Sequence, residues 1–175
     1  MNMLQLLPIS TTLAIALIAT YTDLKKGTIS NYLTLSAAIF GVVFSLSIDG
    51  IGGAAASLSW ALAGALVPAI LFKFNAMGGG DVKLFFAMGA LLKNSSIIEI
   101  EMTAFIIGAI YGIALFIANG VLLKKIRAVA AVHKPFVKNR VEFIENDKTE
   151  IKFAPSILGA VVIVQTLNLF NQGIF

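Results

Sequence analysis

Two aspartates, Asp23 and Asp81, are the residues whose type and placement could do chemistry. Each lies at one edge of a long apolar segment, the first after residues 4–22 and the second before residues 82–92. Two carboxylates held close together share one proton, because like charges at short range do not readily both ionise. The ionised member can take a proton from water while the protonated member polarises a carbonyl group. The two residues therefore form a candidate catalytic pair for peptide hydrolysis.

The composition excludes several other kinds of site. The sequence has no cysteine, which rules out a disulfide framework, a thiolate nucleophile and a cysteine-ligated zinc site. His133 is the single histidine, so a pair of histidines cannot bind a metal. We accordingly expect no metal site and no cofactor. Acid–base chemistry by two carboxylates requires none of these groups.

The elements that must position the two acids are membrane helices. Of the 175 residues, 58% are hydrophobic and 13% are charged, whereas soluble domains have about 45–50% apolar and about 25% charged residues. We therefore predict an all-α polytopic membrane protein in which residues 1–175 form one membrane-embedded domain with about six transmembrane helices. The expected spans are residues 4–22, 32–48, 51–72, 82–92, 100–123 and 154–170.

The basic residues predict the orientation of these spans. With the N-terminus outside, 12 of the 13 Lys and Arg residues fall in inner loops and only Lys93 lies outside, as the positive-inside rule expects. Residues 124–153 then form a long cytoplasmic loop. The net charge of +4 is explained by attraction to an anionic inner leaflet, so we expect no nucleic-acid partner. The acids Asp49, Glu99 and Glu101 are assigned to the outer face, where they need no functional explanation.

Three glycines, Gly78, Gly79 and Gly80, directly precede Asp81. Glycine permits positive φ and close backbone approach, so an extended substrate could lie against this loop. A structural alternative is that Asp81 simply caps a helix after a glycine turn. For Asp23, the structural alternative is an interfacial acid beside neighbouring lysines. Lys83 could steady the acid or contact a lipid phosphate.

The motifs around both acids resemble those of a known protease family. The run Gly78 to Asp81 matches the GxGD pattern of membrane aspartyl proteases, and its continuation into Val-Lys-Leu is similar to type IV prepilin peptidases. The run from Asp23 to Asn31 resembles the other half of that family's signature, with Ser30 where the family has proline. The Lys-Phe-Ala-Pro run that begins at Lys152 resembles the segment that opens the family's last helix.

This resemblance implies an aspartic endopeptidase in a prokaryotic cytoplasmic membrane, with its active site facing the cytoplasm. The pair Asp23 and Asp81 would be catalytic, and the glycines with Lys83 would shape the substrate loop. The substrates would be prepilin or preflagellin-like proteins, which lose a short basic leader. The sequence is similar to the short core-only form found in tight-adherence (Flp-type) pilus systems. It has no zinc-binding cysteine region, so we expect no N-methyltransferase activity. The oligomeric state is not specified.

Two other classes of function remain open. One is a small ion-coupled transporter or channel, although such proteins place a charge near the midplane, often at a broken helix. The other is a non-catalytic scaffold of a pilus or secretion system, in which both aspartates would be replaceable. A presenilin-like protease keeps the chemistry but needs its acids deeper in the bilayer.

Overall fold

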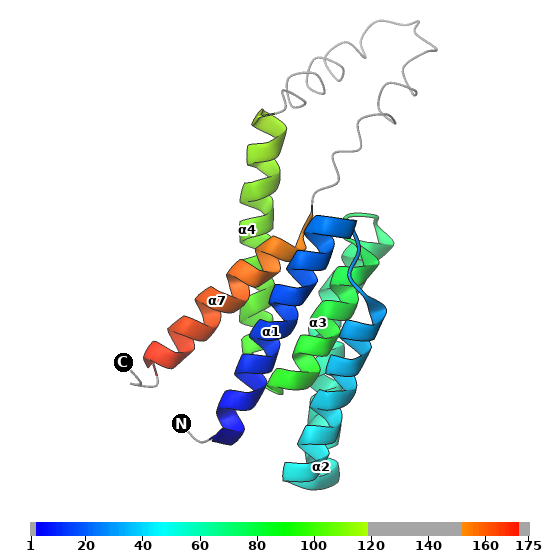
Figure 1. Ribbon diagram of the computed structural model, residues 1–175, viewed down its shortest axis with the longest axis vertical. Coiled ribbons are helices and arrows are strands. Elements are labelled where there is room, and N and C mark those ends of the chain that lie inside the picture. The colour runs from blue at the N-terminus through cyan, green and yellow to red at the C-terminus, as the bar shows by residue number, and fades with distance from the viewer. Residues whose placement is uncertain (1–2, 119–151, 172–175) are drawn as a thin grey trace, which may run out of the picture. The chain divides into compact units, whose positions relative to one another are not determined.

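The computed structural model describes residues 3–118 and 152–171, and this part of the chain is helical throughout apart from short connections (Figure 1). It contains no strand in these ranges, which confirms the all-α class. The helices are α1 (Met3–Lys26), α2 (Asn31–Lys73), α3 (Gly79–Leu92), α4 (Ser96–Ala118) and α7 (Ala154–Asn171).

The chain divides into two compact units. The first comprises Met1–Ile107 and Lys152–Phe175, and it holds every residue of the candidate site. The second is Gly108–Ile151, of which the structure describes only residues 108–118, the last turns of α4. The predicted cytoplasmic loop at 124–153 therefore lies outside the described residues, except for its last two.

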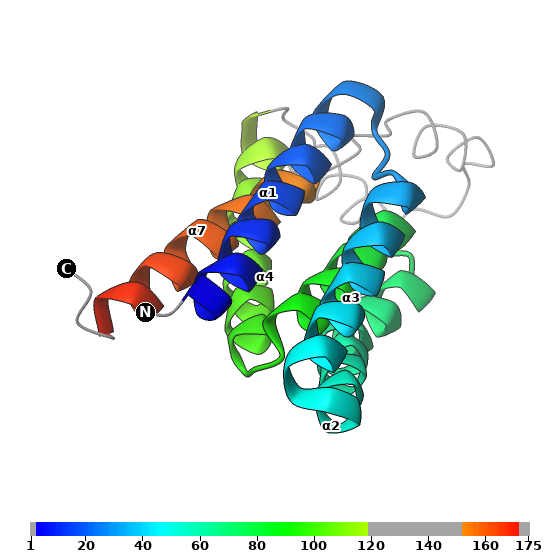
Figure 2. The same ribbon diagram turned by 60° about the horizontal axis from the view of Figure 1, so that its bottom comes forward.

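Within residues 3–118 and 152–171, four helical segments are long and apolar enough to cross a membrane: Leu6–Lys26, Asn31–Lys73, Ser96–Leu115 and Ala154–Asn171. The chain is thus a polytopic membrane protein. A straight helix of 43 residues would be about 64 Å long, twice the hydrocarbon core of about 30 Å. The backbone of α2 is non-helical at Gly50 (φ 65°, ψ −153°), where the chain turns back on itself (Figures 1 and 2). This break separates two arms, residues 31–49 and 51–73.

The remaining predicted span corresponds to α3, which has 14 residues, fewer than the ~20 of an ordinary span. The count of about six transmembrane helices therefore stays a prediction. Burial explains how so short a helix is held in place. Leu84, Phe85 and Met88 are fully buried because α3 packs against both α1 and α2.

Close backbone contact joins α3 to the two arms of α2. A Cβ atom added to Gly41 in the first arm would lie 2.8 Å from the backbone of Ala90, and one added to Gly89 would meet the carbonyl oxygen of Trp60 in the second arm. Ser57 also donates a hydrogen bond of 2.7 Å to the carbonyl of Ala90. In a membrane, where neighbouring lipid is as apolar as leucine, small residues and interhelical hydrogen bonds of this kind hold helices together.

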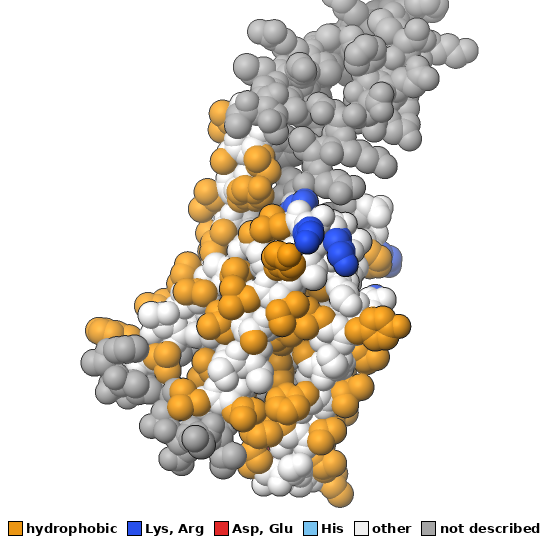
Figure 3. Space-filling view, in the orientation of Figure 1, with side chains coloured by type: hydrophobic (Ala, Val, Ile, Leu, Met, Phe, Trp, Pro, Cys, Tyr) orange, Lys and Arg blue, Asp and Glu red, His pale blue; other side chains and the backbone are white. Residues whose placement is uncertain are grey.

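The helix ends that carry the candidate site lie together at one end of the first unit. α1 ends, α2 begins and ends, and α3 and α7 begin at the upper end in Figure 1. Lysine side chains gather at that end in the view of Figure 3. The turn at Gly50 lies at the opposite end, where Lys93 forms a 2.6 Å ion pair with Asp49. Asp23 and Asp81 therefore share one end, and Lys93 lies at the other. Which end faces the cytoplasm stays a prediction.

Glu101, which was expected at the outer face, has a buried side chain near the start of α4. Its side chain is only 4% exposed, and its Oε1 is buried with no hydrogen-bond partner among the described residues. It lies one turn from both Ile97 and Phe105 on the same face of α4. Ile97 lies against Gly64 of α2, and Phe105 packs beside Phe85 of α3. The apolar run indicated roughly where α4 begins but not which face of the helix turns inward.

Candidate active site

Asp81 is buried at the start of α3. Gly78 is the N-cap of this helix, with extended backbone angles (φ −74°, ψ 143°), and Asp81 is its third residue. The amide of Asp81 donates a hydrogen bond of 3.1 Å to the carbonyl of Gly78. The side chain of Asp81 is 7% exposed. The structural alternative, in which Asp81 caps the helix, is therefore wrong. The carboxyl group of Asp81 is instead enclosed by the protein.

The three glycines make room around this carboxyl group. A Cβ on Gly78 would lie 3.1 Å from Oδ2 of Asp81, and one on Gly79 would lie 3.2 Å from the ring of Phe72. None of the three has the positive φ that the sequence suggested, since Gly27 and Gly50 are the positive-φ glycines of the described residues. Glycine is needed at these positions because neighbouring groups leave too little room for a Cβ atom.

Asp23 lies in the last turns of α1. Gly27 (φ 66°) ends this helix, and its amide donates a hydrogen bond of 2.8 Å to the carbonyl of Asp23. A glycine with positive φ is a common helix terminator, which explains why α1 stops at this point. The Asp23 side chain is half-buried, and its Oδ2 is buried with no hydrogen-bond partner among the described residues. One oxygen of this carboxylate is thus available to another group.

The segment that follows Asp23 packs against the glycines that precede Asp81. A Cβ on Gly80 would lie 3.1 Å from the Cβ of Ile29, in the connection between α1 and α2. α1 and α3 also pack against each other directly. The two motifs, 58 positions apart, therefore meet at one place. The sequence placed both acids at the same end, and the structure adds that they approach each other laterally.

The two carboxyl groups interact electrostatically. Asp81 precedes the apolar part of α3 and lies outside the four candidate spans. The pKa of Asp81 is raised from 3.8 to about 7: burial is the largest cause, the negative charge of Asp23 adds to the rise, and a backbone hydrogen bond with Gly78 opposes it. Charge repulsion and loss of hydration both disfavour an ionised Asp81. Near neutral pH this acid can therefore hold a proton beside Asp23.

Lys83 does not steady Asp81 in the structure. Its Nζ donates a hydrogen bond of 2.8 Å to Oδ1 of Asn31, the first residue of α2. The ion pair between Lys93 and Asp49 is the salt bridge found among the described residues, so Lys83 has no acidic partner there. The contribution of Lys83 is therefore to link the starts of α2 and α3.

A further lysine, whose contact the sequence did not suggest, supports the end of α1. Lys152 donates a hydrogen bond of 2.6 Å to the carbonyl of Leu24, the residue after Asp23. Close by, the hydroxyl of Thr20 donates to the carbonyl of Ala154 at 3.1 Å. Carbonyls in the last turn of a helix lack partners within it, so a cation is favourable there. The start of α7 is therefore attached to the turn that carries Asp23.

The arrangement provides one acid that can stay protonated and a second with an oxygen free of hydrogen bonds. Such a pair can activate water by general acid–base catalysis. Among residues 3–118 and 152–171, no group of three or more His, Cys, Asp or Glu side chains could hold a metal ion.

The fold and the site together define a helical membrane protein with a paired-carboxyl site at one end. A sequence model described as the type IV leader peptidase family matches residues 10–113, more than half of the chain and a range that includes both aspartates. The chain belongs to this family, and the family-level activity is that of a leader peptidase. No curated protein and no solved structure matches the chain.

The pKa of Asp81 provides a test of the pairing that needs no substrate. In an infrared titration of the purified protein, with buried Glu101 replaced by glutamine throughout, we expect a protonated-carboxyl band that disappears near pH 7 and is lost in Asp81→Asn. Asp23→Asn removes the repulsion but leaves the larger cause, burial, so the pKa of Asp81 should fall yet stay above 3.8. A titration that is identical with and without the Asp23 charge would contradict the interaction between the two groups.

Proposed function

We propose that this chain is an aspartic endopeptidase of the GxGD class, with Asp23 and Asp81 as its catalytic pair. The observation that carries this proposal is the meeting of the two motifs at one end of the bundle, where Ile29 lies against Gly80 and α1 packs on α3. There burial, and to a lesser extent the charge of Asp23, raises the pKa of Asp81. In the proposed reaction the ionised acid removes a proton from water, which attacks the scissile carbonyl. The protonated acid donates to the carbonyl oxygen. The peptide C–N bond then breaks, and the amine takes up the proton.

The proposed substrates are prepilin-like proteins that carry a short basic leader before an apolar helix. Membership of the leader peptidase family supports this class. The proposed site of cleavage is the cytoplasmic membrane surface, because Asp23 lies in the last turns of α1 and Asp81 in the first turn of α3. Several lysines at the same end are favourable beside an anionic leaflet. We propose no N-methyltransferase activity.

Leader cleavage by the purified protein tests the proposal. The chain is reconstituted into lipid vesicles with a prepilin-like substrate, and the mass of the substrate is measured over time by mass spectrometry. The expected result is loss of the leader by a single cut before the apolar helix. Substrates that stay intact, while the protein keeps its helical content and its vesicle insertion, would overturn the proposal.

The orientation can be tested by cysteine labelling, because the chain has no native cysteine. Ser30 is exposed at the end that carries the two acids, and Asn94 is exposed beside Lys93 at the other end. We expect a membrane-impermeant maleimide to label Ser30→Cys in inverted vesicles but not in intact cells, and Asn94→Cys in intact cells. The reverse pattern would place the acids outside and contradict cytoplasmic cleavage.

A transporter or channel is the principal alternative. Buried Glu101 is the observation that bears on it, because an acid inside a membrane bundle often belongs to an ion path. However, Glu101 lies only about 7.5 Å along α4 from its start at Ser96, and not at a broken helix. Ion flux that persists when both Asp23 and Asp81 are replaced would favour this alternative. Replaceable aspartates with neither flux nor cleavage would favour a scaffold.

A further inference from the structure

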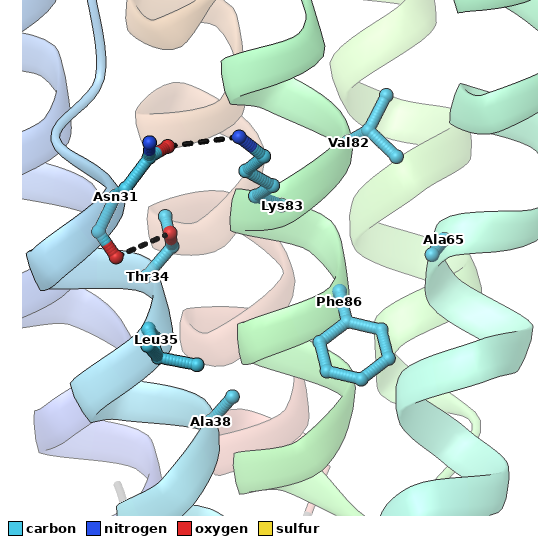
Figure 4. A pocket seen from close by; sticks show the side chains of 8 residues that line it. All are labelled: Asn31, Thr34, Leu35, Ala38, Ala65, Val82, Lys83 and Phe86. Carbon is cyan, nitrogen blue, oxygen red and sulfur yellow. Dashed lines mark hydrogen bonds between the residues drawn. The ribbon is translucent and has the colours of Figure 1, made fainter.

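A second potential binding site lies on the other side of α3 from the two aspartates. It is a cavity of about 380 Å³ between α3 and the two arms of α2 (Figure 4). The first arm contributes Leu35 and Ala38, the second contributes Ala65, and α3 contributes Val82 and Phe86. Small-molecule sites in proteins usually measure about 300–1,000 Å³, so the cavity is large enough for a ligand.

The walls of this cavity suit a hydrocarbon chain. Along its length the lining is alanine, valine, leucine and phenylalanine, with the hydroxyl of Thr34 bonded to the carbonyl of Asn31 in its own helix. Leu35 is 61% exposed, so the cavity opens on the outer surface of the bundle. In a membrane protein that surface meets lipid. An acyl chain can therefore enter from the side without leaving the bilayer.

The rim of the cavity is cationic. Lys83 and Asn31 lie together at one end of the cavity, and Lys83 Nζ donates to Asn31 Oδ1 at 2.8 Å (Figure 4). Lys83 is exposed and forms no ion pair with an acid in the described part of the chain. The Asn31 amide nitrogen carries two further donors. An ammonium and an amide at the membrane-edge end of an apolar cavity complement a phosphate joined to an acyl chain.

The cavity is separate from the candidate catalytic pair. Lys83 and Phe86 project from one side of α3 toward the cavity, whereas the buried side that carries Asp81 continues through Leu84 and Phe85. A polypeptide being cut between the two aspartates would not occupy this side of the helix. A basic leader would also be repelled by Lys83. The location and the charge both favour lipid over substrate.

The geometry points to a binding site for an anionic phospholipid, with an acyl chain in this cavity and the phosphate on Lys83 and Asn31. This inference goes beyond the proposed peptidase activity and does not depend on it. Because Asn31 begins α2 and Lys83 lies two residues after Asp81, a bound lipid would join the two helix ends beside the catalytic pair.

Native mass spectrometry of the delipidated protein tests the head-group contact. Phosphatidylglycerol and phosphatidylcholine with identical acyl chains are titrated separately. We expect the wild type to bind one phosphatidylglycerol at least about tenfold more tightly than phosphatidylcholine, because the quaternary ammonium of choline repels Lys83 and offsets the attraction of the phosphate that both lipids carry. Lys83→Gln should remove this preference, and Lys83→Arg should keep it. Lys26→Gln is the matched control, an exposed lysine that does not line the cavity, and should leave the preference unchanged.

Filling the cavity tests the acyl contact. Ala65→Leu should lower the affinity for phosphatidylglycerol, while Ala55→Leu, an exposed alanine of the same arm outside the cavity, should not. Size-exclusion profiles establish that both variants are folded. Three outcomes would overturn the inference. They are equal binding of the two lipids, a Lys83→Gln variant that keeps the preference, and competition by chain-free glycerophosphate as strong as that by the whole lipid.

Discussion

Replacing either Asp81 or Asp23 by asparagine is expected to lower the rate of leader cleavage by about 10²–10⁴-fold. Asparagine keeps the size of the side chain but can neither accept a proton from water as a carboxylate does nor donate a carboxylic-acid proton. The pair works with one shared proton, so each member is needed. The rates are measured by mass spectrometry with the reconstituted variants and a prepilin-like substrate.

The double variant distinguishes a catalytic pair from two independent acids. Groups that act as a unit give strongly non-additive losses, so Asp23→Asn with Asp81→Asn should be little slower than either single variant. Asp49→Asn is the control, because it removes an exposed acid at the opposite end of the unit, where Asp49 pairs with Lys93. Wild-type cleavage by either single active-site variant would remove the basis for the proposed mechanism.

The class of fold and the placement of the two acids at one end of the bundle were predictable because both depend on where apolar runs stop. Asp23 and Asp81 interrupt long apolar segments, and the intervening chain crosses twice through the arms of α2. Two acids with an even number of crossings between them must lie on the same side. Membership of the leader peptidase family agrees with the resemblance seen in the motifs. The role of these residues in catalysis is a prediction that the cleavage assay must test.

Lateral arrangement was not predictable, because it depends on which faces of the helices pack together. The contact between Ile29 and Gly80 joins the two motifs, yet no sequence pattern around either residue predicts it. Burial of Glu101 has the same origin: α4 is apolar on every side, so its sequence has no polar face to show which way it turns. The contact of Lys152 with the end of α1 joins positions 128 apart in the sequence. No local pattern reports such a contact.

Gly89→Ala is expected to destabilise the bundle strongly. The added Cβ would meet the Trp60 carbonyl oxygen and would lie 2.8 Å from the Trp60 carbonyl carbon and 2.9 Å from the Cα of Ala61. All three atoms are backbone, so no side chain can rotate away, and α3 must move from the second arm of α2. Overpacking of this kind costs about 1–3 kcal/mol, occasionally more. The apparent unfolding temperature in detergent should fall, by ~2–4 °C per kcal/mol.

Cleavage should decline as well, because α3 carries Asp81 and a shift of the helix moves its carboxyl group away from Asp23. Gly52→Ala is the matched control: it adds the same methyl group to a helical glycine, but nothing lies within 4 Å of the new Cβ. Alanine is the better helix former by about 0.5–1 kcal/mol, so this variant should unfold at the same temperature or a higher one. Equal unfolding temperatures for the two variants would show that the close contact between α3 and α2 does not hold α3 in place.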